Sequence, residues 1–461
     1  MKRKKQFSLL FAVVLAFGIC TADADPSYCF RIYLKDKGVT DASLADPSQF
    51  LSAEAIARRE KRLTDITLTD VPIAASQIAA IAAENVRIVT QSKWMGTVVV
   101  ESSDSLIFNR LKALPTVDSV LLVWRGEDRL KSRNCTENTV QLTPSSEKMS
   151  DDYGYSREQI EMLNGIRLHD LGKRGQGMRI AVIDAGFLNV NKIAAFSSLN
   201  LIGTHNVVFP DGDVYCDDEH GTKVLSCLAA NLPGLMVGTA PEASYLLIKS
   251  EDPRAEYPIE EDFWAAALEY ADSVGVDIVS SSLGYSKFDL IDTIYRTADL
   301  DGKTAFISQV ADIAEEKGML LFVSAGNEGN QTWQKITFPA DAADILTVGS
   351  INGQGEHSSF SSTGFTADLR VKPDIVALGS YTTVIDSSGN IAHSNGTSFA
   401  TPIAAGLGAC LWQACSWLNN KEIIQLIRST ASQADRPDVE QGYGVPDFYK
   451  AYQKELNGPV Q

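Results

Sequence analysis

The order of apolar and polar positions divides the chain into two differently patterned parts. From about 151 to 455, continuous apolar runs of four to seven residues are each followed by small residues and a stretch of helical period. Runs without alternation are typical of strands in a parallel sheet covered by helices on both faces. The pattern therefore predicts an α/β fold with a doubly wound, mostly parallel sheet. Predicted strands are 179–183, 245–248, 277–279, 320–323, 345–348 and 375–378, and predicted helices are 260–273, 304–317, 399–412 and 421–429.

The part from 25 to 125 alternates shorter strands and helices. Strands are predicted at 28–34, 86–89, 97–101 and 117–123, and helices at 53–62 and 106–114. Two βαβ-like halves of this size predict a small α+β domain of the ferredoxin-like kind. Residues 126–150 then lose all periodicity and are rich in Ser, Thr, Asn, Lys and Glu, which predicts an exposed linker that is open to cleavage.

The first 24 residues have the pattern of a signal peptide. A basic start at 1–5 is followed by a short apolar run at 7–19 and by an A-x-A cleavage signal that ends at Ala24. The apolar run is shorter than the roughly 20 residues that a spanning helix needs, so we expect export without a transmembrane anchor. The expected location is extracellular, periplasmic or at the cell surface. Cys20 offers a lipoprotein alternative, which bulky Ile19 disfavours.

Charge and metal-ligand spacing exclude two classes of function. The formal net charge of −17 argues against a nucleic-acid partner, which would favour a basic face. Cys216, His220 and Cys227 lie close together in the sequence, but no second CxxC or HxxxH accompanies them. We therefore predict no metal site there.

Six cysteines follow the predicted signal peptide. They are Cys29, Cys135, Cys216, Cys227, Cys410 and Cys415. Export permits disulfides, but spacing alone does not fix the pairing. Cys410 and Cys415 point about 140° apart on a predicted helix and should not pair with each other. Cys29 opens the first strand and Cys135 follows the last strand of the small domain, so we predict a Cys29–Cys135 disulfide, with two unpaired thiols as the alternative.

Three polar residues stand where strands end or helices begin. Asp184 follows the strand 179–183, His220 opens a helical stretch, and Ser398 precedes a helix of small apolar residues. Taken singly, each has an ordinary structural interpretation as a turn residue, a structural histidine or a helix cap. Together they occur in the chain order Asp, His, Ser, separated by 36 and 178 positions, which is one of the known orders of a nucleophilic triad.

Short motifs surround each of these residues. The segments IAVIDAG, HGTKV, SSSLG, SAGNEG and NGTSFATP resemble the subtilisin-like serine proteases (subtilases, peptidase family S8) between about 155 and 451. Residues 25–125 resemble, more weakly, the inhibitory propeptide of such proteases. The resemblance implies a subtilisin-like fold for 151–455. It also implies that Ser398 is the nucleophile, His220 its base, Asp184 the group that orients His220, and Asn327 the oxyanion-hole donor.

The resemblance extends to substrate-binding segments. Ser282, Leu283 and Gly284 match the edge that pairs with an extended peptide. The opposite wall of the first pocket would consist of Ser324, Ala325 and Gly326. Ala185, Lys223 and Phe399 depart from the family's pattern without removing a reacting group. Asp218 is expected to orient the segment that enters His220.

The predicted function is a secreted serine endopeptidase that acts on proteins or peptides. Its own propeptide would inhibit it and be removed by self-cleavage in the linker. No cofactor is required; calcium stays possible, but 229–238 lacks the Asn-rich loop that often binds it. Two alternatives remain: a catalytically inactive peptide-binding protein has no need for all four catalytic groups, and an esterase would need a G-x-S-x-G elbow around Ser398. A dedicated processing enzyme and a broad degradative one both stay open.

Overall fold

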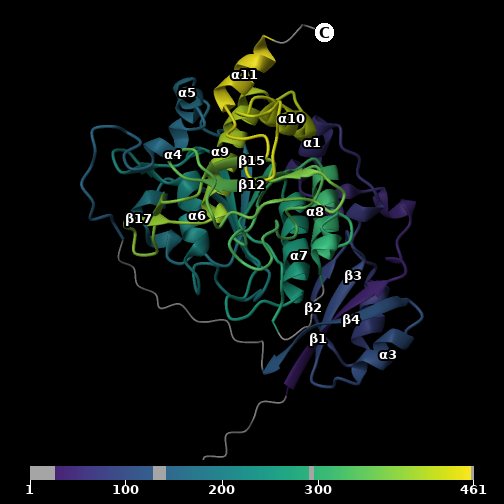
Figure 1. Cartoon of the computed structure of the whole chain (residues 1–461). Coiled ribbons are helices and arrows are strands. Elements are labelled where there is room, and N and C mark those ends of the chain that lie inside the picture. Colours follow the sequence, from purple (N-terminus) through teal and green to yellow (C-terminus); the bar gives the residue numbers. More distant parts are fainter. Residues whose placement is uncertain (1–25, 128–141, 290–294, 458–461) are drawn as a thin grey trace, which may run out of the picture.

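Seven parallel strands form the centre of the larger part of the molecule (Figure 1). The structure is a computed structural model of the chain that describes residues 26–127, 142–289 and 295–457. The strand order is β15-β12-β11-β10-β5-β9-β6. β10, β11 and β12 are buried along their whole length, as expected for a parallel sheet between two helical layers. The strands are β5 (Arg179–Asp184), β6 (Asn200–Asn206), β9 (Ser244–Lys249), β10 (Ile278–Ser281), β11 (Leu320–Ser324), β12 (Leu346–Ile351) and β15 (Ile375–Leu378).

The direction of winding reverses at β5. From β5 the chain builds β6 and β9 on one side, then returns to place β10, β11, β12 and β15 on the other. In such sheets the crevice for a ligand lies beyond the carboxyl ends of the strands at the reversal point. A ligand crevice is therefore expected beside the residues that follow β5, β10 and β11.

Helices cover both faces of this sheet. α6 (His220–Ala229) and α9 (Thr397–Ala414) share one hydrophobic cluster with alternate side chains of the strands, including Val182. α7 (Ile259–Ser273) and α8 (Phe306–Glu316) share the other cluster, which includes Ala181 and Ile183. The predicted doubly wound α/β fold is confirmed, although the edge strand β6 was not predicted. Smaller helices are α4 (Arg157–Glu161), α5 (Gly165–Asp170), α10 (Asn420–Ser429) and α11 (Phe448–Leu456). Short paired strands are β7 (Asn231–Leu232), β8 (Met236–Val237), β13 (Gly364–Phe365), β14 (Val371–Lys372), β16 (Thr382–Ile385) and β17 (Ile391–Ser394).

The N-terminal unit, residues 26–127, is a four-stranded antiparallel sheet with the order β2-β3-β1-β4. This is the order of the predicted ferredoxin-like arrangement. One face packs against α2 and α3 through Ile81, Ile107 and Leu111, and the other carries Val99 and Trp124 into the cluster of α7 and α8. The elements are β1 (Pro26–Leu34), α2 (Ala75–Ala82), β2 (Arg87–Ser92), β3 (Thr97–Ser102), α3 (Ile107–Ala113) and β4 (Val117–Glu127).

A segment between β1 and α2 stands apart from this sheet. It contains η1 (Asp41–Leu44), η2 (Pro47–Gln49), α1 (Ala53–Arg62) and η3 (Leu68–Asp70). Ser52 caps α1, since its hydroxyl accepts a hydrogen bond from Ala55 N at 3.1 Å. The sequence analysis predicted that the helix 53–62 belongs to the first βαβ half. In the structure α2 occupies that place instead. α2 was not predicted, because its alanine-rich run shows little contrast between apolar and polar positions.

Several predictions fall wholly or partly outside the described residues. These concern the signal peptide at 1–24 with Cys20, the thiol of Cys135, and most of the linker 126–150. The described end of that linker runs along the larger domain, where Leu142 N–H donates to Lys192 O at 2.9 Å. In the part of the chain that the structure describes, no helix is both long and apolar enough to cross a membrane.

Candidate active site

Asp184 is the last residue of β5 and is completely buried. Its Oδ1 accepts hydrogen bonds from Ala185 N at 2.8 Å and from His220 Nδ1 at 2.7 Å. Because an ionised carboxylate only accepts, Nδ1 carries the proton and Nε2 is left to act as an acceptor. Among the described residues Asp184 Oδ2 has no hydrogen-bond partner. Apart from the N–H of Ala185, the His220 imidazole is thus the only group of the described residues that donates a hydrogen bond to this carboxylate.

His220 is the first residue of α6, and its side chain is one-third exposed (33%). Its backbone N–H donates to Asp218 Oδ1 at 2.6 Å, which fixes the start of the helix as the sequence suggested for Asp218. Phe399 lies beside the imidazole, with ring centroids 5.8 Å apart. Burial lowers the pKa of His220, but the charge and hydrogen bond of Asp184 outweigh it, with Asp218 and Glu251 adding to the effect, and raise the pKa to about 9. The imidazolium is therefore strongly stabilised here.

Ser398 is the second residue of α9 and is 7% exposed. Pro402, one turn further on, has no N–H to offer the Ser398 carbonyl; Ser282 Oγ donates to that carbonyl instead, at 2.8 Å. In return Ser398 Oγ donates to Ser282 O over a long 3.4 Å. No hydrogen bond joins Ser398 Oγ to His220 Nε2 within the described residues, as is common in sites without substrate.

Asn327 follows β11 and is held by the start of α9. Its Oδ1 accepts hydrogen bonds from Thr397 N at 3.0 Å and from Thr397 Oγ1 at 3.1 Å. With the oxygen occupied, the amide can donate only through Nδ2, which makes no hydrogen bond to any described residue. The backbone N–H of Ser398, in the first turn of α9, also has no partner there. Two donors without a partner among the described residues thus lie at the start of α9, an arrangement that can stabilise an oxyanion.

The predicted substrate-binding segments follow neighbouring strands. Ser282–Gly284 comes after β10 and Ser324–Gly326 after β11, and Ser324 Oγ donates to Leu283 O at 3.4 Å between them. Neither the N–H nor the C=O of Gly284 forms a hydrogen bond with a described residue, so both are free to pair with an extended chain. Gly326 has φ of +103°, and a Cβ there would lie 2.7 Å from Thr337 Cγ2, so the wall requires glycine.

Sequence reasoning missed three polar residues near Asp184, which are Lys249, Glu251 and Tyr285. Lys249 ends β9, and its buried ammonium donates to Ala185 O at 2.5 Å and lies 3.7 Å from Asp217; burial lowers the pKa of Lys249. Glu251, whose pKa burial raises to about 8, accepts a hydrogen bond from Tyr285 OH at 2.9 Å. A signal existed for Lys249 alone, because a charged residue ends an otherwise apolar strand run.

The other candidates from the sequence have structural roles. Cys216 takes part in a disulfide bond, and Cys227, Cys410 and Cys415 are buried free thiols. The predicted Cys29–Cys135 disulfide is wrong for this structure, because Cys29 is a buried cysteine that forms no disulfide bond. Between 26 and 457, leaving out the two undescribed stretches, no group of three or more His, Cys, Asp or Glu side chains could hold a metal ion.

Comparisons with known proteins match both parts of the chain. The family model "Subtilase family" matches residues 175–444, and the model "Peptidase S8 propeptide domain, Bacteroidota" matches residues 29–139. Subtilisin E of Bacillus subtilis (strain 168) is 29% identical over 278 residues, covering 59% of this chain and 65% of that protein. Subtilisin of Bacillus pumilus is 28% identical over 278 residues, covering 59% of this chain and 90% of that protein. The chain thus spans slightly less than two thirds of the length of subtilisin E.

Proposed function

The chain belongs to the subtilase family, and from that premise we propose that it is an exported serine endopeptidase in which Asp184, His220 and Ser398 form the catalytic triad. The observation that supports the proposal most strongly is the buried Asp184–His220 hydrogen bond of 2.7 Å beside a serine at a helix start. A carboxylate that serves one imidazole, next to a hydroxyl with only a weak partner, is what acyl transfer by a serine requires.

The proposed mechanism assigns each step to a group of this chain. Ser398 Oγ attacks the scissile carbonyl while His220 Nε2 takes its proton, and Asp184 stabilises the imidazolium that forms. The carbonyl oxygen becomes an oxyanion that accepts hydrogen bonds from Asn327 Nδ2 and from the backbone N–H of Ser398. His220 then returns the proton to the leaving amine, and water repeats the sequence to release the acyl group. These steps require no cofactor, and we assign no role to calcium.

The peptide substrate would lie along Ser282–Gly284 and place its first side chain against Ser324–Gly326. The free N–H and C=O of Gly284 support pairing of this edge with an extended chain. We further propose that the N-terminal unit inhibits this site until the connecting segment is cut by the enzyme itself. Processing of selected targets and broad degradation are both compatible with this edge.

Covalent labelling tests the proposal directly. The purified, exported protein is treated with a fluorophosphonate probe that reacts with activated serines, and the labelled peptide is identified by mass spectrometry. We expect one labelled site, Ser398, and loss of labelling in Ser398→Ala and in His220→Ala. Labelling that persists in His220→Ala would exclude His220 as the base. A chain that neither labels nor cleaves any member of a peptide library after removal of its N-terminal unit would support the inactive peptide-binding alternative.

A further inference from the structure

Glu251 lies between the proposed triad and the edge that is proposed to hold the substrate, yet the proposed mechanism gives it no role. It comes two residues after β9, the strand that pairs with β5 up to Asp184. Ser250 N–H donates to Asp184 O at 3.1 Å, which brings the half-buried Glu251 beside the triad. On its other side, Glu251 Oε1 accepts from Tyr285 OH at 2.9 Å, and Tyr285 directly follows Gly284. This carboxyl group thus connects the triad to the substrate edge.

Two further glutamates lie close enough to Glu251 for their charges to interact. Glu260, in the first turn of α7, is 2% exposed, and its Oε1 accepts from Asp252 N at 3.0 Å. Burial raises the pKa of Glu260 well above its usual range, and the charges of Glu251 and Glu256 add to the rise. Negative charge is therefore concentrated beside the triad, between the end of β9 and the start of α7.

The basic side chains of this region are engaged with other acids. Lys249 Nζ lies 3.7 Å from Asp217, and Arg254 Nε lies 2.6 Å from Asp252 Oδ1. Within the described residues, no basic side chain forms an ion pair with any of the three glutamates at positions 251, 256 and 260. The cation that would balance these acids is thus not supplied by the described part of the chain.

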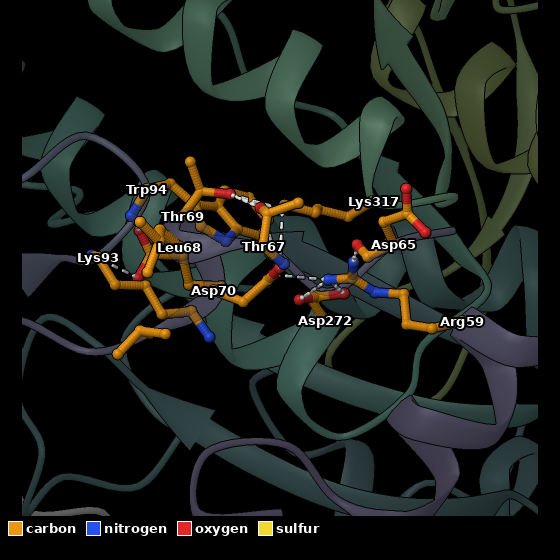
Figure 2. A network of polar contacts seen from close by, with 12 residues as sticks. Arg59, Asp65, Thr67, Leu68, Thr69, Asp70, Lys93, Trp94, Asp272 and Lys317 are labelled. Carbon is orange, nitrogen blue, oxygen red and sulfur yellow. Dashed lines mark hydrogen bonds and ion pairs between the residues drawn. The ribbon is translucent and has the colours of Figure 1, made fainter. Parts of the chain in front are cut away.

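Buried carboxylates elsewhere in this protein are paired with permanent cations. Asp70 and Asp272 are both completely buried, and Arg59 forms an ion pair of 2.8 Å with each of them (Figure 2). Lys317 adds an ion pair of 2.9 Å to Asp70. A carboxylate that is removed from water without such a partner is costly, because its charge is neither solvated nor neutralised. A cation that arrives with a bound molecule would therefore be attracted to Glu251.

The surroundings of Glu251 suit the side chain of lysine or arginine. Such a side chain carries its charge at the end of a long apolar stem, which packs along apolar surface. Tyr257, Leu283 and Tyr285 all belong to the hydrophobic cluster of α7 and α8, so apolar surface adjoins the acids. A metal ion is a poorer match, because no group of three or more His, Cys, Asp or Glu side chains among the described residues could hold one.

The strand order determines which side of a bound peptide faces Glu251. Ser324–Gly326, the proposed wall for the first side chain, follows β11, whereas Asp184 and Glu251 follow β5 and β9 on the other side of β10. Successive side chains of an extended peptide point to opposite sides. We count residues from the one whose carbonyl is attacked toward the N-terminus. When the first side chain faces β11, the second and the fourth face β9.

The segment that connects the two parts of this chain has a matching sequence. Trp124 of β4 packs against Tyr257, with ring centroids 6.0 Å apart, so β4 ends near the loop that carries the acids. Basic residues then occur at every second position of the sequence: Arg129, Lys131 and Arg133. Residues with this spacing point to one side of an extended chain. The segment that the enzyme is proposed to cut in itself thus carries the expected charge at the expected spacing.

We propose that Glu251 is a specificity-determining residue, which selects substrates with lysine or arginine at the second or fourth position before the cleaved bond. The basic side chain forms an ion pair with Glu251, and the charges of Glu256 and Glu260 add to the attraction. This inference rests on the proposed peptidase function and narrows its substrate class to peptides that are basic on the side facing β9.

Cleavage of a matched peptide set tests this inference. The purified, exported enzyme is given internally quenched peptides of one sequence, in which each of the four positions before the cleaved bond is lysine, methionine or glutamate in turn. Mass spectrometry verifies the cleaved bond, and kcat/KM is measured for each peptide. We expect lysine to exceed methionine by about tenfold at the second or fourth position, because the contact is a hydrogen bond between charged groups. A lysine preference at the first or third position instead, or at none of the four, would overturn the proposal.

Substitution of Glu251 tests whether this residue is the source of the preference. Glu251→Gln keeps the size of the side chain but removes its charge, so the ratio of lysine to methionine should fall to about one. Glu242→Gln is the matched control, because Glu242 is an exposed acid just before the opposite end of β9, and it should keep the ratio of the parent. Equal ratios in the two variants would overturn the assignment.

Fluorophosphonate labelling of Ser398 shows whether each variant has a folded site. If Glu251→Gln does not fold, the position profile of the parent still decides the proposal. A chain that labels at Ser398 and cleaves peptides without the lysine preference would refute the role of Glu251 alone. A chain that neither labels nor cleaves would overturn the proposed peptidase function together with it.

Discussion

Asp184 at the carboxyl edge of the sheet and Asp272 at the end of α7 are both completely buried, yet their charges are compensated differently. Both oxygens of Asp272 accept from permanent cations: Oδ1 from Arg58 and Arg59, and Oδ2 from Arg59. Asp184 has one hydrogen-bonded oxygen, its other oxygen has no partner among the described residues, and its main neighbour is a histidine. A saturated carboxylate can only hold a structure together. An undersaturated one stabilises a positive charge that appears during a reaction.

The donors in the two regions differ in the same way. Lys317 Nζ has three protons and three acceptors, on Thr67, Thr69 and Asp70. At the other edge, Ser398 Oγ has one weak contact, and no described residue accepts from Asn327 Nδ2. We therefore expect reactivity where donors and acceptors lack partners, and stable attachment of the N-terminal unit to the larger domain where all of them are paired. The following substitutions test that distinction.

The largest expected effect is on catalysis, from Ser398→Ala. Removing the nucleophile should lower kcat by about a million-fold, the size reported for loss of a triad serine. The melting temperature should change little, because Ser398 Oγ contributes only a 3.4 Å hydrogen bond. Peptide hydrolysis and differential scanning calorimetry on the same preparation measure both quantities. Wild-type turnover in this variant would mean that another residue attacks the substrate.

Asp272→Ala should have the opposite signature. It leaves the buried guanidinium of Arg58 without its hydrogen-bonded carboxylate and that of Arg59 with Asp70 alone, so we expect the free energy of unfolding of the uncut chain to fall by about 3–5 kcal/mol. Urea unfolding in the Ser398→Ala background measures this. Glu316→Ala, an exposed acid at the end of α8, is the control and should change stability by less than about 0.5 kcal/mol. Equal effects of the two substitutions would show that the ion pairs of Asp272 with Arg58 and Arg59 add no stability of their own.

Asn327→Ala comes next in size. Loss of an oxyanion-hole donor should lower kcat by about 100- to 1,000-fold while KM changes little, because the hydrogen bond to Nδ2 forms in the transition state. Steady-state kinetics on a chromogenic peptide separate the two constants. A raised KM with unchanged kcat would make Asn327 a binding residue. Thr397 should keep its position through the rest of α9, so the fold is expected to persist.

The two regions also differ in how much of them the sequence predicts. The strands that lead to Asp184 and Asn327 are continuous apolar runs, and each residue of the proposed site lies in a short local motif, so the sequence pattern predicts that these residues gather at one edge of the sheet. The contacts of residues 41–70 with the larger domain depend on pairs such as Arg59 with Asp272, which lie 213 positions apart. Nothing local distinguishes these residues from the charges of a solvated helix. The orientation of α1 is likewise set by tertiary contacts, which is why the sequence placed it on the wrong sheet.

The pH dependence of serine labelling sharpens the comparison further. His220 must be neutral to act as a base, and its pKa is about 9. The rate of fluorophosphonate labelling should therefore rise about tenfold for each pH unit below 9 and level off above it. Since the folded pKa lies above the unfolded value, stability from the imidazolium is complete below about pH 6.5 and is lost as pH rises through 9. A rate independent of pH between 6 and 9 would exclude His220 as the base.

The smallest expected effect comes from Asp218→Asn. The asparagine oxygen can still accept the hydrogen bond from His220 N, now 2.6 Å long, so the start of α6 should be preserved. The negative charge that helps to raise the pKa of His220 is lost, so this pKa should fall and the labelling profile should move toward neutral pH. At pH 7 the labelling rate should increase by about two- to fivefold, because more of the imidazole is neutral.

Asp213→Asn removes an acid of the same loop that does not contact His220, and it should leave the profile in place. If both variants shifted it equally, the effect would be one of general charge. If Asp218→Asn slowed labelling at every pH, the contact would position the helix in a way that asparagine cannot reproduce. A shift that is confined to Asp218→Asn would show that the charge of this one neighbour contributes to the pKa of His220.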